Sequence, residues 1–186
     1  MTHPQRSSSQ KSKPRPLNPA RLEEMALAYV ARFATSAAKL EAYLKRKLRE
    51  RGWDGEGEPD TAALVARFVA AGYVDDEAWA RAKSGSLLRR GYGMRRVSQA
   101  LGAGGISEDL RESVRPAEGE QRRAALALAR KRGFGPFGRE APDREKREKQ
   151  LAAMLRAGHA LDSARELVNA PSEEAAEEWA AGFDEN

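Results

Sequence analysis

The sequence contains no cysteine, which excludes disulfide bonds and thiolate metal sites. This absence fits a protein of the reducing cytosol. No segment approaches the ~20 consecutive apolar residues that a membrane-spanning helix needs. The polar and basic N-terminus also lacks the apolar core of a secretory signal. We therefore expect a cytoplasmic protein that does not contact a membrane.

Aromatic residues make up only 6% of the chain, so a thick aromatic core is not expected. Hydrophobic residues amount to 40%, mostly alanine and leucine, while 33% of the residues are charged. Alanine, leucine, glutamate, lysine and arginine dominate, and all five are strong helix formers. The composition therefore predicts an all-α protein that is thin and elongated.

Residues suited to catalysis are also scarce. The two histidines are His3, near the N-terminus, and His159, at the end of a predicted helix. The sequence has no HExxH motif, Walker phosphate loop or nucleophile elbow. Its carboxylates mostly stand where helix caps and i,i+4 ion pairs would place them. We expect no enzyme, cofactor or metal site, and an enzyme using the carboxylate-rich surface is the weakest hypothesis.

Positive charge is in excess, but it is unevenly distributed along the chain. The net charge is +5, yet no acidic residue precedes Glu23 and no basic residue follows Pro171. A basic body flanked by an acidic end suggests a polyanionic or acidic partner, such as nucleic acid or a nucleoprotein. The alternative is a solvated surface whose charge serves only solubility.

Helical patterns recur along the chain in groups of three. One short pattern appears three times, at 48–53, 101–106 and 154–159: an apolar residue, three residues, glycine, then a bulky residue. Another helix follows each time. This order predicts three tandem three-helix repeats of roughly 50 residues, stacked into an elongated, curved array. Chance similarity is the alternative, because glycine commonly follows a helix.

The predicted organisation has five parts. A disordered basic leader (1–18) precedes helical repeats at 19–73, 74–115 and 116–170, and an acidic tail (171–186) ends the chain. We expect the tail to screen the basic face when no partner is bound.

Each repeat contains a cluster of basic residues, near the junction of its first two helices or along the second. The clusters are Lys45, Arg46, Lys47, Arg49 and Arg51 in the first repeat, Arg89, Arg90, Arg95 and Arg96 in the second, and Arg122, Arg123, Arg130, Lys131, Arg132, Arg144, Lys146, Arg147 and Lys149 in the third. In a stacked array they can line one face and contact phosphates or acidic protein. Acidic residues are interleaved, so a solvated helix face is the alternative. No pattern in the chain predicts contacts to base edges, so any nucleic-acid binding should be independent of the nucleotide sequence.

The junction between the first two repeats lies at residues 72–81. Gly72 suits the left-handed position that ends a helix, and Asp75 can cap the next one. Asp76 adds negative charge to the first turn of that helix. We expect Tyr73 and Trp79 to pack the seam between the repeats.

Residues 72–81 resemble the signature Gly-Tyr-Leu-Asp-Asp-Glu-x-Phe-Ala-Arg of the RecX family. Residues 89–106 resemble its Arg-Gly-x-Gly-Pro segment and Gly-Ile helix stop, and 44–53 resemble its Arg-Lys-Leu-x-x-Arg-Gly-Phe element. The resemblance covers about residues 22–168 and is strongest in the middle repeat. Met94 stands where the family usually has proline, and His159 replaces a usual phenylalanine.

The resemblance implies a regulator of the RecA recombinase, built of three tandem three-helix repeats. Such proteins bind in the deep groove of the RecA–DNA filament and inhibit filament growth, ATP hydrolysis, strand exchange and coprotease action. The expected setting is homologous recombination, DNA repair and the SOS response. The expected partners are the RecA filament and, more weakly, single- or double-stranded DNA, bound by a monomer. The alternative is a nucleoid protein that binds DNA through its charge alone.

Overall fold

The computed structural model describes residues 15–182. Most of the predicted leader (1–14) and the last residues of the predicted tail (183–186) lie outside that range. Within it the chain is helical, and its β-type contact is an isolated bridge between Leu17 and Trp53. The elements are α1 (Pro19–Val30), α2 (Ala37–Arg51), α3 (Thr61–Ala70), α4 (Asp76–Arg89), α5 (Met94–Gly102), α6 (Glu108–Ser113), α7 (Glu118–Arg132), the 3-10 turn η1 (Gly135–Phe137), α8 (Arg144–Arg156), α9 (Leu161–Asn169) and α10 (Glu173–Ala181). The all-α prediction is confirmed.

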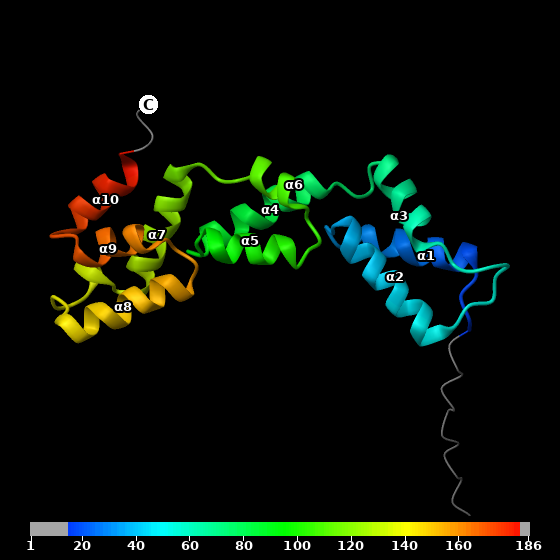
Figure 1. The fold of residues 1–186 in the computed structure, drawn as a ribbon, viewed down its shortest axis with the longest axis horizontal. Helices are drawn as coiled ribbons and strands as arrows, with labels where there is room; N and C mark the ends of the chain where they lie inside the picture. Colours follow the sequence, from blue (N-terminus) through cyan, green and yellow to red (C-terminus); the bar gives the residue numbers. More distant parts are fainter. Residues whose placement is uncertain (1–14, 183–186) are drawn as a thin grey trace, which may run out of the picture.

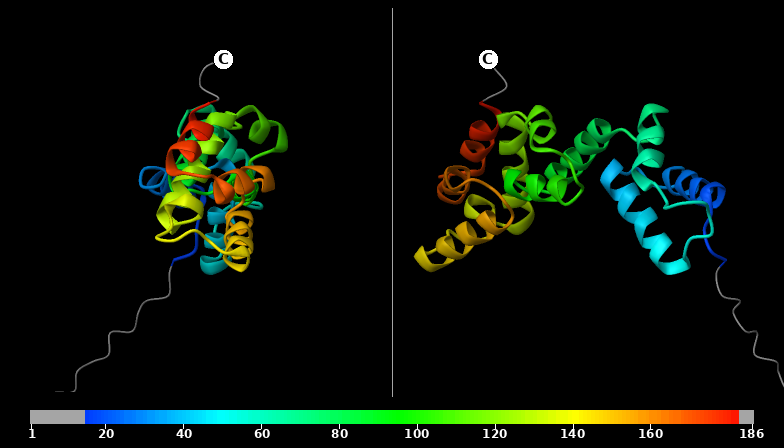
Figure 2. Two further views of the ribbon diagram at one scale, coloured as in Figure 1. Left: turned by 90° about the vertical axis from the view of Figure 1, so that its left-hand side faces the viewer. Right: turned by 45° about the vertical axis from the view of Figure 1, so that its right-hand side comes forward.

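The helices form three groups that follow one another along the long axis of the molecule (Figure 1; Figure 2). The first group is α1–α3, the second α4–α6 and the third α7–α10. Each has its own hydrophobic cluster, in which Leu40, Leu101 and Met154 are almost completely buried. Helix α7 also contributes Ala124 to the second cluster. The order of the groups follows that of the predicted repeats, whose equivalence stays a prediction.

The predicted cap at Asp75 agrees with the structure, and two serines begin other helices in the same way. Ser36, Asp75 and Ser107 each accept a hydrogen bond from the backbone amide three residues later, at the start of α2, α4 and α6. This bond satisfies one of the free amides of a first helical turn. Gly72 has a φ of +73° and ends the first group. Among residues 15–182, no helix combines the length and the apolar character needed to cross a membrane.

Both predicted flanking segments are shorter than expected. Leu17 is completely buried, and its backbone bonds to the amide of Asp54 and the carbonyl of Gly52. The first group therefore begins before residue 18. In the predicted tail, α10 buries Ala176 and Ala180, and Ala176 belongs to the third cluster. The acidic composition hid this apolar stripe, although its i, i+4 spacing is that of a core-facing helix.

The seam between the first two groups contains hydrogen bonds, and the backbones of the two groups come close together there. The Ser36 hydroxyl donates to the Gly104 carbonyl, and the Ala37 amide donates to Asp76 Oδ1 over 2.8 Å. Gly105 leaves no room for a side chain there, since an added Cβ would lie 2.1 Å from that of Ala38. The start of α2 is thus fixed directly to the second group.

Tyr73 does not lie in this seam. Its side chain is 58% exposed and its ring lies 5.4 Å from that of Phe68, within the first group. Trp79 packs chiefly on Gly104 in the second group, while Lys39 of α2 places its ammonium 5.3 Å from the indole ring centroid. Of the two aromatic residues expected in the seam, Trp79 lies at it and Tyr73 does not. The hydrogen bonds across the seam involve Ser36 and Asp76 instead.

Candidate functional site

The basic cluster of α2 is largely neutralised by its own helix. Lys45 pairs with Glu41 over 2.7 Å, and both Arg46 and Lys47 reach Glu50. The hydrogen bond from Lys47 lowers the pKa of Glu50. Arg51 donates to the backbone carbonyl of Arg15, and Arg49 is exposed without an ion pair in the described part of the chain. Such exposed pairs are weak, so a stronger anion can displace the carboxylates.

Aromatic rings lie beside this cluster. Tyr43 stacks on Tyr29 at 4.2 Å between ring centroids, and the Arg46 guanidinium lies 5.6 Å from the Tyr43 ring. Phe33 lies at the edge of these rings and is 55% exposed. Phe33 follows the end of α1 at Val30, so its exposed ring extends this aromatic surface beyond the helix.

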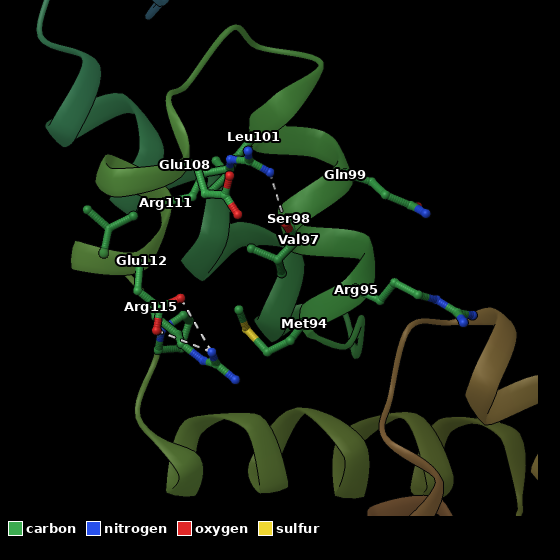
Figure 3. Close-up of a pocket in the computed structure, with 12 residues that line it drawn as sticks. Met94, Arg95, Val97, Ser98, Gln99, Leu101, Glu108, Arg111, Glu112 and Arg115 are labelled. Carbon is green, nitrogen blue, oxygen red and sulfur yellow. Dashed lines mark hydrogen bonds and ion pairs between the residues drawn. The ribbon is translucent and has the colours of Figure 1, made fainter.

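The second cluster divides between two roles. Arg89, Arg90 and Arg96 are exposed, and Arg90 lies 5.3 Å from the Tyr92 ring centroid. The Arg95 guanidinium instead donates to the carbonyl of Leu155 in the last turn of α8. It thereby satisfies one of the free carbonyls of a helix end and places positive charge at the negative end of the helix dipole. Figure 3 shows Arg95 extending from α5 toward the third group.

The seam between the second and third groups is built backbone to backbone. The Gly93 amide donates to Ala157 over 3.0 Å, and the Arg95 amide donates to Gly158 over 3.1 Å. A Cβ on Gly93 would lie 2.3 Å from the Gly158 carbonyl carbon. The amino end of α5 thus meets the carboxyl end of α8, so that free amides satisfy free carbonyls.

His159 belongs to this seam. It is buried, and its Nε2 lies 3.0 Å from the Gly91 carbonyl, so that nitrogen carries the proton and donates. Burial lowers the pKa of His159, and the bond to Gly91 partly opposes that effect. The imidazole is therefore a neutral packing and hydrogen-bonding group. No group of three acidic, histidine or cysteine residues within 15–182 could hold a metal ion.

The third cluster is scattered by the fold. Arg122 pairs with Glu118 and lies over the Trp179 ring, and Arg130 pairs with Glu177 of α10. On α8, Arg144 and Lys149 pair with Glu148 and Glu145, while Lys146 and Arg147 are exposed without an ion pair in the described chain. Lys131 and Arg132, at the end of α7, are exposed as well.

One pocket joins the second and third basic clusters, and we call it the seam pocket. It has a volume of 120 Å³. Its lining is Arg90, Tyr92, Leu128, Lys131, Arg132, Phe134, Ala153 and Ala157. No described acidic side chain lines it. Of the predicted binding residues, the fold therefore brings Arg90, Lys131 and Arg132 together, while those of α2 lie in another group.

A second cavity, of 380 Å³, lies between α5 and α6 (Figure 3). Its charged residues are of both signs: Glu108 and Glu112 lie among its arginines, Arg115 bonds to Glu112, and Arg111 donates to the Ser98 hydroxyl. The mixed charges make it a poor site for an anion. The seam pocket is the better candidate.

The chain is similar in sequence to two proteins described as regulatory protein RecX. The protein from Myxococcus xanthus is 34% identical over 166 residues, covering 84% of this chain and 89% of the relative. The protein from Mycobacterium sp. strain KMS is 33% identical over 173 residues, covering 87% and 89%. No family model matches the chain.

In structure, the chain is similar to the crystal structure of RecX from Lactobacillus salivarius. The TM-score is 0.64 at 16% identity, covering 80% of this chain and 93% of that one. This likeness shows a shared fold.

Proposed function

The chain belongs to the RecX family of regulatory proteins, and from this we propose that it regulates RecA by binding the RecA–DNA filament. Bound there, it inhibits filament growth, ATP hydrolysis and strand exchange during homologous recombination, DNA repair and the SOS response. It acts by occupying the filament and needs no catalytic group of its own.

The shape of the molecule carries this proposal. Three helical groups lie in a row, joined by hydrogen-bonded seams, and each exposes cations: Arg49 in the first, Arg96 in the second and Lys131 in the third. A filament presents the same protein and phosphate surfaces at regular intervals. One monomeric array can therefore contact several subunits at once, and linked weak contacts add to a strong one.

The direct test mixes the protein with RecA, single-stranded DNA and ATP. We expect ATP turnover to slow at substoichiometric ratios, because one array bridges several subunits and blocks further extension. Filament length should fall in parallel by electron microscopy. Unchanged ATPase rate and unchanged filament length would rule out this function.

The alternative is a nucleoid protein that binds DNA through charge, and the cation–aromatic surface around Tyr43 favours it. It predicts tight, strongly salt-dependent binding to free DNA with no preference for the filament. Charge reversal at Arg89, Arg90 and Arg96 separates the two functions. Loss of RecA inhibition with unchanged DNA binding supports contacts to RecA protein, whereas equal losses support contacts to phosphates. Arg95 is left intact because it caps α8.

A further inference from the structure

We propose that the seam pocket binds one phosphate group of a nucleic-acid strand. The proposal deepens the proposed function and rests on it for its setting, because it names the nucleic acid of the filament as what this surface contacts. The pocket exists only where the second and third groups are docked.

The cations of the pocket are placed by a rigid part of the fold. Arg90 follows the last residue of α4, while Lys131 and Arg132 end α7. The two helices approach closely: a Cβ on Gly91 would lie 3.1 Å from backbone atoms of Leu128. The second and third groups therefore converge on one hollow without a flexible connection, which reduces the entropy lost when an anion binds.

The charge of the pocket is not neutralised from within the protein. Among residues 15–182, neither Arg90, Lys131 nor Arg132 makes an ion pair, in contrast to Lys45 and Lys47 on α2. The helix dipole favours cations at the carboxyl end of a helix, and this explains why each of the two helices ends in basic residues. The carboxyl ends of α4 and α7 meet at this hollow, so their cations gather there and leave a positive charge that an anionic ligand can neutralise.

The size of the pocket limits what enters it. The seam pocket has a volume of 120 Å³. That volume suits a phosphate group of five heavy atoms. It is well below the roughly 300 Å³ at which pockets for drug-sized ligands begin. A whole nucleotide therefore does not fit inside, whereas the phosphate of a passing strand does.

The aromatic residues of the pocket favour a nucleic-acid strand over an acidic peptide. The Tyr92 ring holds the Arg90 guanidinium at 5.3 Å, and Phe134 forms another part of the lining. An arginine held by stacking presents its planar fork to a phosphate in a fixed orientation. Both rings are only partly buried, so a sugar or base next to the bound phosphate can pack on them.

The test measures binding of a fluorescein-labelled dT oligonucleotide to the full chain by fluorescence anisotropy, without RecA. The triple variant Arg90→Gln, Lys131→Gln, Arg132→Gln should bind at least about tenfold more weakly, since hydrogen bonds to charged groups are lost. The matched control is Arg165→Gln, which removes an exposed cation of α9 outside the pocket and should leave affinity unchanged. Thermal melts of all variants confirm that they fold.

The salt dependence tests the claim of one phosphate. For single strands, the slope of log K against log salt changes by about 0.7 for each phosphate neutralised. The triple variant should therefore lower the slope by about 0.7. A fall of about 2 would mean that the three cations contact separate phosphates, and the one-phosphate pocket would be wrong. Wild-type affinity in the triple variant would overturn the proposal outright, as would a wild-type chain that fails to bind the oligonucleotide.

A RecA assay on the same variants separates this proposal from the proposed function. Wild-type protein that fails to inhibit the RecA ATPase contradicts the proposed function, even if the oligonucleotide results support the pocket. A triple variant that loses inhibition but keeps its affinity for the oligonucleotide assigns the pocket to a carboxylate of RecA. That outcome refutes the nucleic-acid proposal while leaving the proposed function intact.

Discussion

At the scale of single residues, the seam between the second and third groups depends on side chains that are absent or neutral. Gly93 and Gly158 let two backbones meet, and His159 fills the remaining space. The sequence predicts the helix end at Gly158, where α8 does end, but makes no such prediction for Gly93, which is the N-cap of α5. It does not show that residues 93 and 158 touch, because contacts between distant residues leave no local pattern.

His159 makes the stability of the fold depend on pH. Burial lowers its pKa below the ordinary value of 6.5, so the unfolded chain takes up a proton before the folded chain does. Its contribution to the free energy of unfolding is therefore complete above pH 6.5. That contribution decreases as the pH falls through the folded pKa, by at most about 1.4 kcal/mol per pH unit.

The variant His159→Phe removes this titration but keeps a ring of similar size. Urea unfolding of both proteins between pH 7.5 and pH 5 should show the wild type losing stability relative to the variant as the pH falls. Parallel curves for the two proteins would contradict the assignment.

At the scale of elements, α10 shows how charge can hide a structural helix. The segment was predicted to be an acidic tail because of its four glutamates, yet it forms a helix that packs on α7 and buries Ala176 and Ala180. The same glutamates do meet basic residues, since Glu177 pairs with Arg130. The predicted screening of basic charge thus has a local counterpart, at one arginine of the third cluster.

If α10 is part of the third group, removing its aromatic residue should destabilise that group. Trp179 is partly buried and lies 4.7 Å from the Arg122 guanidinium. Trp179→Ala should lower the free energy of unfolding by about 2 kcal/mol, since packing and a cation–π contact are both lost. The control Glu178→Ala changes an exposed residue of the same helix and should stay within about 0.5 kcal/mol. Equal urea midpoints for the two variants would show that α10 contributes nothing.

At the scale of the whole molecule, the proposed function requires that the angle between the groups suit a repeating partner. The order of helices was accessible from sequence because each group has its own local pattern of apolar residues and caps. The angle was not, because it is set by contacts such as Asp76 with the amide of Ala37, 39 positions away. Two neighbouring aspartates allow the contact across the seam to be tested separately from helix capping. Asp75 caps α4 within its own group, whereas Asp76 accepts a hydrogen bond from across the seam.

Asp75→Ala and Asp76→Ala are therefore matched variants. Each removes one carboxylate from the start of α4 and one hydrogen bond to a backbone amide, so each should cost about 1 kcal/mol of stability. Only the Asp76 variant loses a hydrogen bond across the seam, which loosens the first group against the second, so its small-angle X-ray scattering should change while that of the Asp75 variant does not. RecA inhibition should then weaken several-fold more in the Asp76 variant, because a misaligned array loses its linked contacts. Identical scattering and identical inhibition in the two variants would show that this seam does not set the shape on which binding depends.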